Sequence, residues 1–127
     1  MSNKVPFFIS IDFEDFSHDY KRSLGIIENN LRINALEKSY FKIKEFANKN
    51  LKNKNFTFFT TGILAEKAGD LIKQISKDGN EVSCHYYYHD LIYNQNRQPL
   101  SKNIDKAIEI IEKRTGTIPP GFRAPEV

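Results

Sequence analysis

Short apolar runs alternate along the chain with longer segments in which apolar residues recur every three or four positions. The first run, residues 5–13, is nearly continuous and rich in aromatic and β-branched residues, which is typical of a strand buried on both faces of a parallel sheet. Three further strands are predicted at 56–61, 81–85 and 121–125, and the periodic segments predict helices over 35–51, 63–77 and 101–116. The polar segments 14–34 and 86–100 are expected to be loops. This order predicts an α/β fold with parallel strands alternating with helices.

Composition limits the chain to one domain and excludes several classes of protein. Of its 127 residues 39% are apolar, enough for a single core, since single domains typically run about 100–150 residues. The net charge is only +3 and the lysines are scattered, so the sequence does not favour nucleic-acid binding. Six glycines, five prolines and one cysteine do not fit a collagen or a disulfide scaffold. We therefore expect residues 1–127 to form one domain.

The sequence also predicts where the protein is found. No stretch approaches the roughly 18 consecutive apolar residues of a membrane span. The first apolar run meets acidic residues without a small-residue cleavage site, so it does not read as a signal peptide. Cys84 has no other cysteine with which to form a disulfide within the chain. We expect a cytoplasmic protein with no membrane span.

Residues able to do chemistry follow the ends of the predicted strands. They are Asp12, Glu14 and Asp15 after the first strand, His85 and His89 after the third, and Arg123 in the fourth. Active sites of parallel α/β folds lie at the carboxyl ends of the strands. Two histidines and a carboxylate suit Zn²⁺, with one coordination position open for water. The four-residue spacing of the histidines lets both rings converge, although such a pair also arises by chance in many chains.

Three motifs in order resemble the NodB-type polysaccharide deacetylases. They are Ser-Ile-Asp-Phe-Glu-Asp-Phe (10–16), His-Tyr-Tyr-Tyr-His (85–89) and Gly-Phe-Arg-Ala-Pro-Glu (121–126). The first motif departs from the commonest family form, in which two adjacent aspartates precede a glycine. It is similar to the Asp-x-Glu-Asp variant of proteins in surface-polysaccharide biosynthesis. The resemblance implies that the chain is the first half of an incomplete (β/α) barrel, ending after the third motif.

The resemblance also implies a role for each site residue. Asp12 corresponds to the general base, and Arg123 to the arginine that pairs with it and keeps it ionised. His85 and His89 correspond to metal ligands, with a divalent cation, Zn²⁺ by default, as cofactor. The metal-binding carboxylate is either Glu14 or Asp15. Strand alternation puts Glu14 on the face of Asp12, whereas Asp15 would have to turn in through the loop.

The function implied is that of a metal-dependent hydrolase. It would remove N-acetyl groups from an amino sugar of a surface polysaccharide or of its precursor, so an N-acetylated carbohydrate is the expected partner. The alternative is a non-catalytic fragment that binds a sugar or a protein. A second copy or a second polypeptide could complete the barrel. Because the family's general acid belongs to a later motif, we expect residues 1–127 alone to be inactive or nearly so.

Overall fold

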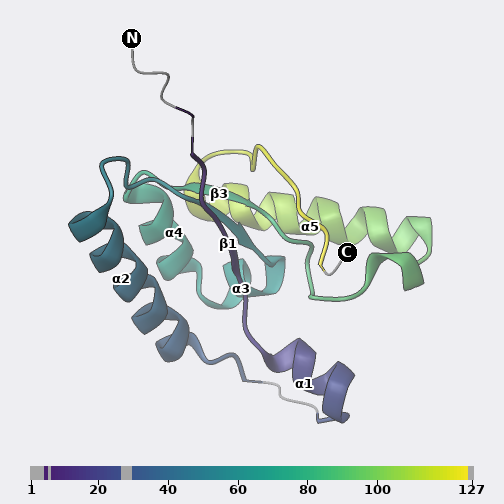
Figure 1. Ribbon diagram of the computed structural model, residues 1–127. Coiled ribbons are helices and arrows are strands. Elements are labelled where there is room, and N and C mark those ends of the chain that lie inside the picture. The colour runs from purple at the N-terminus through teal and green to yellow at the C-terminus, as the bar shows by residue number, and fades with distance from the viewer. Residues whose placement is uncertain (1–4, 6, 27–29, 126–127) are drawn as a thin grey trace.

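The fold is a small parallel sheet with helices on one side, which confirms the α/β prediction. The computed structural model describes residues 5, 7–26 and 30–125 (Figure 1). The strands are β1 (Ser10–Phe13), β2 (Thr57–Thr60) and β3 (Glu81–Cys84), hydrogen-bonded in that order and all parallel. The helices are α1 (Ser17–Leu24), α2 (Ile33–Asn50), α3 (Gly62–Lys67), α4 (Gly69–Lys77), a short 3₁₀ turn η1 (Ile92–Asn94) and α5 (Arg97–Thr115).

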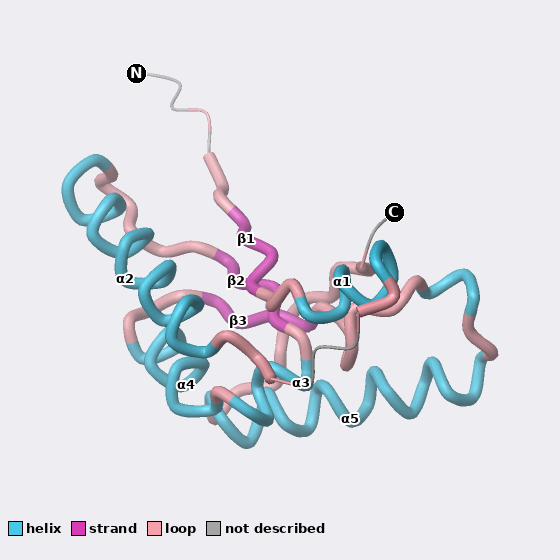
Figure 2. The backbone as a smooth tube through the Cα atoms, turned by 90° about the horizontal axis from the view of Figure 1, so that it is seen from below, coloured by secondary structure: helices cyan, strands magenta, loops and turns pink. Residues whose placement is uncertain are grey.

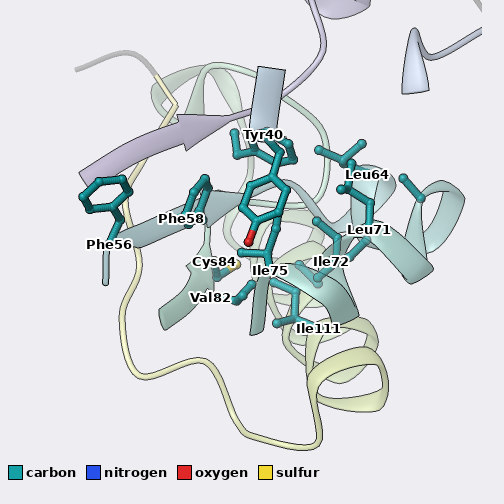
Figure 3. Close-up of a cluster of buried hydrophobic side chains, with 14 of the residues drawn as sticks. Tyr40, Phe56, Phe58, Leu64, Leu71, Ile72, Ile75, Val82, Cys84 and Ile111 are labelled. Carbon is teal, nitrogen blue, oxygen red and sulfur yellow. The ribbon is translucent and has the colours of Figure 1, made fainter. Parts of the chain in front are cut away.

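The two faces of the sheet differ in polarity. Ile11, Phe58 and Val82 lie in one row across the strands, and Ile11 packs against the edge of the core. Phe58 and Val82 lie within the core together with Tyr40, Leu64, Ile72, Ile75 and Ile111 of the helices (Figure 3). The next row, Ser10, Thr57 and Glu81, points to the other face, and so does the row of Asp12, Phe59 and Ser83. Because successive side chains of a strand point to opposite faces, the residues that pack in the core lie on one face and the candidate site residue Asp12 lies on the other.

The first strand is shorter than predicted. The predicted strand over 5–13 begins too early, because Val5, Phe7 and Phe8 are exposed and the strand starts at Ser10. The prediction that it is buried on both faces is also wrong, because Ser10 and Asp12 are exposed. The neighbouring strand begins only at Thr57, whose N–H donates to the carbonyl of Ile9 at 3.1 Å. Among the earlier residues that the structure describes, 5, 7 and 8 have no neighbouring strand with which to pair, so apolar character alone does not make them part of the sheet.

The predicted fourth strand is reduced to a single bridge. Phe122 bridges Cys84 in parallel, where the Cys84 N–H donates to the carbonyl of Gly121 and the Arg123 N–H donates to the carbonyl of Cys84, both at 2.9 Å. Prolines at 119, 120 and 125 flank this bridge. Because proline has no N–H to donate, the ladder cannot extend far in either direction.

The helices agree with the periodicity except where local contacts interrupt it. Helix α2 lies within two residues of its predicted bounds and buries Tyr40 and Ala47. The predicted helix 63–77 is divided at Ala68, where a Cβ at Gly69 would collide with the Arg114 side chain. That arginine donates to the carbonyls at the end of α3, at 3.2 Å from Ala65. Helix α5 begins four residues before the predicted start.

Helix α1 was not predicted at all. It lies in the segment 14–34, which was expected to be a loop, and it follows the carboxyl end of β1 (Figures 1 and 2). Gly25 ends it in the left-handed conformation, with φ at 66°. Within the described ranges, no helix is long and apolar enough to cross a membrane.

Candidate metal centre and its neighbouring ion pair

Asp12 and Arg123 form an ion pair on the polar face of the sheet. The Arg123 guanidinium donates to Asp12 Oδ1 at 2.6 Å and to the hydroxyl oxygen of Ser10 at 2.7 Å. Its central carbon lies 4.1 Å from the centroid of the Phe59 ring. The strand ends thus hold the planar guanidinium from three directions, as cation–π and charge-assisted contacts do. Both charged side chains stay more than one third exposed and so remain accessible to a ligand.

Glu14, His85 and His89 converge at the carboxyl end of the sheet. Each offers one ligand atom, and these atoms lie within 4.8 Å of one another. Glu14 Oε2 is 2.8 Å from His89 Nε2 and 3.3 Å from His85 Nε2. Both imidazoles are buried, whereas the Glu14 side chain is 22% exposed. Residues from two strand ends and the following loop therefore meet as a group that could hold a metal ion.

The hydrogen bonding of His85 explains why this group suits a cation. Its Nδ1 lies 2.8 Å from the carbonyl oxygen of Arg123, and a carbonyl only accepts, so the ring hydrogen sits on Nδ1. In the neutral ring, Nε2 is then an acceptor, and it faces a carboxylate oxygen that is also an acceptor. Two acceptors in contact need a positive charge between them, supplied either by protonation of the rings or by a metal ion. The donor set of two imidazoles and a carboxylate fits a divalent cation.

The Glu14 carboxyl group is strongly acidic in this setting. Burial raises its pKa, but when the His85 and His89 rings are protonated their hydrogen bonds and charges lower it by more, so that the pKa lies at about 2 rather than 4.5. The carboxylate is therefore available as an anionic ligand over the physiological range.

Asp15 lies outside this group of possible ligands. Its Oδ1 accepts the N–H of Ser17 at 2.8 Å and its Oδ2 accepts the N–H of Arg32 at 2.9 Å. The side chain is 7% exposed, so both oxygens are committed to backbone amides that burial would otherwise leave unpaired. Of the two carboxylates left open by the sequence, the structure brings Glu14 to the histidines and places Asp15 at the start of α1.

The loop between the histidines is held by α3 and α5. The N–H groups of Gly62 and Ile63, at the start of α3, donate to the carbonyls of Tyr86 and Tyr87 at 2.8 and 2.9 Å. A Cβ at Gly62 would collide with the Tyr87 ring, so this approach requires glycine. Tyr86 is fully buried with φ at 67°, and its hydroxyl oxygen accepts from Asn103 at 2.9 Å. Packing, rather than local preference, fixes this turn.

Three neighbours of the site were not predicted. Ser10 and Phe59 hold Arg123, and Asp19 of α1 lies with Oδ1 3.4 Å from His89 Nδ1. Strand alternation gave a signal for Ser10 and Phe59, since both share the face of Asp12. Asp19 had no such signal, because its segment was expected to be a loop.

Comparison with known proteins defines the class to which this chain belongs. Residues 44–126, about two thirds of the chain, match the family model of polysaccharide deacetylases. The chain therefore belongs to the polysaccharide deacetylase family. The match includes the motifs with the histidines and Arg123, whereas the motif with Asp12 and Glu14 lies before it.

Particular relatives agree with this assignment. The chain is 32% identical over 73 residues to the peptidoglycan-N-acetylglucosamine deacetylase of Bacillus cereus. The aligned region covers 58% of this chain and 26% of that protein. The structure of the peptidoglycan deacetylase PdaC from Bacillus subtilis matches with a TM-score of 0.61 and 26% identity, over 72% of this chain and 43% of that one.

A third relative shares the fold without the activity. A CE4 family pseudoenzyme from Bacillus anthracis matches with a TM-score of 0.67 and 18% identity, over 98% of this chain and 37% of that one. The chain spans less than half of the length of each of these three proteins. The fold alone therefore does not decide between a catalyst and a binding protein.

Proposed function

We propose that this chain carries the metal-binding part of a hydrolase that removes N-acetyl groups from an amino sugar. The observation that supports this most is the convergence of Glu14, His85 and His89 beside the Asp12–Arg123 pair. Arg123 links the two, because its carbonyl oxygen contacts His85 while its guanidinium contacts Asp12. Amide hydrolysis needs an activated water and a base near it, and this arrangement offers both.

Each residue has a distinct part in the proposed reaction. Glu14, His85 and His89 hold the divalent cation, which supplies a polarised amide carbonyl and a more acidic water when it is bound. Asp12 accepts the proton of the water as the carbon–oxygen bond forms. Arg123 orients the Asp12 carboxylate through the hydrogen bond at 2.6 Å. The carbon–nitrogen bond then breaks to give acetate and an amine, which must receive a proton.

We assign the donation of that last proton to a residue outside the described part of this chain. None of the described residues near the ion pair stands ready as a separate acid, since the two histidines described there face Glu14. General acid–base assistance is typically worth about 10²–10⁴-fold in rate. The 127-residue chain by itself should therefore bind metal but turn over little substrate.

Zn²⁺ is the cation we propose, and an N-acetylated glycan the substrate. Imidazole and carboxylate ligands suit zinc, although cobalt and nickel accept the same donors. The Bacillus cereus relative is a peptidoglycan-N-acetylglucosamine deacetylase, which supports N-acetylglucosamine within a polymer as the substrate. A surface polysaccharide or its cytoplasmic precursor would present this group, and cell fractionation tests the predicted cytoplasmic location.

The remaining half of the barrel, from this polypeptide or another, would cover the outer edge of β1. Within the described residues no strand pairs with that edge, and an apolar groove of about 330 Å³ lies beside it. Ile9, Ile11, Phe46 and Phe56 contribute to its lining. Sedimentation of the 127-residue chain tests this proposal. Residues 1–127, as one domain, should either self-associate or bind a hydrophobic dye in the exposed groove. A stable monomer that binds no such dye would contradict the proposal.

The proposed function is tested by metal binding and by turnover. Calorimetric titration of the metal-free chain with Zn²⁺ should show one site, and both His85→Ala and His89→Ala should weaken it. A chitin-type oligosaccharide should be deacetylated by a longer chain that includes the following part of the fold. If the longer chain binds metal but releases no acetate, the non-catalytic alternative holds. If the histidine variants bind as the parent does, the assigned metal centre is wrong.

A further inference from the structure

His89 has a different acidic neighbour at each of its ring nitrogens. Nε2 lies 2.8 Å from Glu14 Oε2, and Nδ1 lies 3.4 Å from Asp19 Oδ1. The His89 side chain is 5% exposed, so its orientation is set by these neighbours rather than by water. Asp19 is 27% exposed and stands in the first turn of α1.

The position of the ring hydrogen decides what His89 can bind. A neutral imidazole carries one hydrogen, and only the other nitrogen has a lone pair for a metal ion. When a cation separates Nε2 from Glu14, a carboxylate at Nδ1 favours the hydrogen on that nitrogen and leaves Nε2 as the ligand. His85 reaches the same state by another route, because its Nδ1 contacts the carbonyl of Arg123.

Asp15 explains how α1 is held in the right place. Its two carboxylate oxygens accept from Ser17 at the start of α1 and from Arg32 just before α2. The helix is thereby tied at its first turn to the segment that enters the core. Asp19, two residues further along the helix, is held at the side of the His89 ring that faces away from Glu14.

We propose that Asp19 is a positioning residue that accepts the Nδ1 hydrogen of His89 when a cation lies between His89 and Glu14, and so holds Nε2 toward that cation. The proposal rests on the metal centre of the proposed function, and it assigns to α1 a role beyond covering the sheet. The competing explanation is that Asp19 merely stabilises the N-terminus of α1, as an acidic residue does at any helix start.

The experiment separates these two roles with matched variants. Asp19→Ala and Asp19→Asn are compared with Asp70→Asn, since Asp70 occupies the first turn of α4. Removal of an outer-shell partner of a histidine ligand typically weakens metal binding about 10–100-fold. Calorimetry with Zn²⁺ should show that loss for Asp19→Ala and a smaller loss for Asp19→Asn, whose amide oxygen still accepts. Asp70→Asn should bind as the parent does.

A second measurement reports the Nδ1 hydrogen directly. Long-range ¹H–¹⁵N spectra of the zinc-bound chain show the hydrogen on Nδ1 of His89 and how fast it exchanges with water. The parent should show a slowly exchanging hydrogen, and Asp19→Ala should make this hydrogen exchange faster. Circular dichroism confirms that each variant remains folded.

The outcomes distinguish failure of the inference from failure of the proposed function. Parent-like zinc affinity and unchanged exchange of the His89 Nδ1 hydrogen in Asp19→Ala would overturn the role of Asp19 and leave the metal centre intact. A parent chain that binds no zinc would overturn both. Weaker binding in Asp19→Ala and Asp70→Asn alike would show that Asp19 acts only on its helix.

Discussion

Two polar clusters at opposite ends of the sheet differ in how their hydrogen-bonding groups are matched. The base cluster, at the amino ends of the strands, consists of Tyr40, Lys44, Asp78 and Asn80. The rim cluster, at the carboxyl ends, consists of Asp12, Glu14, His85, His89 and Arg123. In the base cluster, Lys44 donates to Asp78 at 2.8 Å and Tyr40 donates to the same oxygen.

Asn80 completes the base cluster. Its side-chain NH₂ donates to the carbonyl of Ile75 and its oxygen accepts from the N–H of Phe56, both at 3.0 Å. Each of these contacts pairs a donor with an acceptor, so the cluster needs no ligand to match its groups. In the rim cluster, by contrast, Glu14 Oε2 and His85 Nε2 present acceptors to one another, because the ring hydrogen of His85 is on Nδ1. Matched groups stabilise a fold, whereas mismatched buried groups mark a place where a cation belongs.

The largest effect is expected from Glu14→Gln, which removes the carboxylate of the rim cluster. The amide is a poor metal ligand and carries no charge, so zinc affinity should fall by more than about 100-fold, beyond the usual cost of an outer-shell change. Calorimetric titration measures it. Glu45→Gln, on the exposed face of α2, is the matched control and should bind as the parent does. If Glu14→Gln binds zinc as tightly as the parent does, the contrast between the two clusters is wrong.

Tyr40→Phe should affect stability and leave metal binding alone. The Tyr40 ring is 1% exposed, and its hydroxyl donates to the Asp78 carboxylate. Loss of a hydrogen bond to a charged group should lower the free energy of unfolding by about 1.5–3 kcal/mol. Urea denaturation measures this loss. Tyr93→Phe, at an exposed position of η1, should change stability by less than about 0.5 kcal/mol. Equal effects of both variants would contradict the structural role of the base cluster.

Asp15→Asn should separate the two carboxylates that the sequence left open. An amide has a single oxygen acceptor, so it can accept from only one of the two backbone N–H groups that donate to Asp15. The free energy of unfolding should therefore fall by about 1 kcal/mol. Zinc affinity should fall by less than about 10-fold, through looser positioning of α1 alone. Denaturation and calorimetry on the same sample test both. Asp105→Asn on α5 serves as control, and a loss of affinity equal to that of Glu14→Gln would make Asp15 a ligand.

The smallest effect is the pH dependence of the base cluster. Burial would raise the pKa of Asp78, but hydrogen bonds from Lys44, Tyr40 and Gln74 lower it below 3.8. Burial and the Asp78 hydrogen bond raise the pKa of Tyr40 above 10.0. The Asp78 contribution is therefore present above pH 3.8 and lost as the pH falls further. The Tyr40 contribution is present below pH 10.0 and lost as the pH rises further.

The stability difference between the parent and Tyr40→Phe should consequently be flat between these two limits and shrink outside them. Denaturation curves collected from acid to alkaline pH measure it. A difference that changes steadily across neutral pH would show that another titrating group controls the cluster.

Much of the fold could be predicted because it depends on periodicity along the chain. Helix α2 repeats apolar residues every three or four positions, and burial of that stripe settles where it forms. The three parallel strands follow from the order of elements. The lengths of the first and fourth strands were overestimated, because a residue joins the sheet only where a neighbouring strand lies alongside it.

The chemistry of the site residues was readable in the sequence, since residue type and position at strand ends suffice to suggest ligands and a base. Which carboxylate joins the histidines was not readable. Glu14 and Asp15 are adjacent, and what distinguishes them is the backbone N–H of Arg32, seventeen residues away, which binds Asp15. Helix α1 depends on the same contact and brings Asp19 to His89. Residue identity determined which groups are available, and long-range hydrogen bonds in the folded chain decided which of them meet.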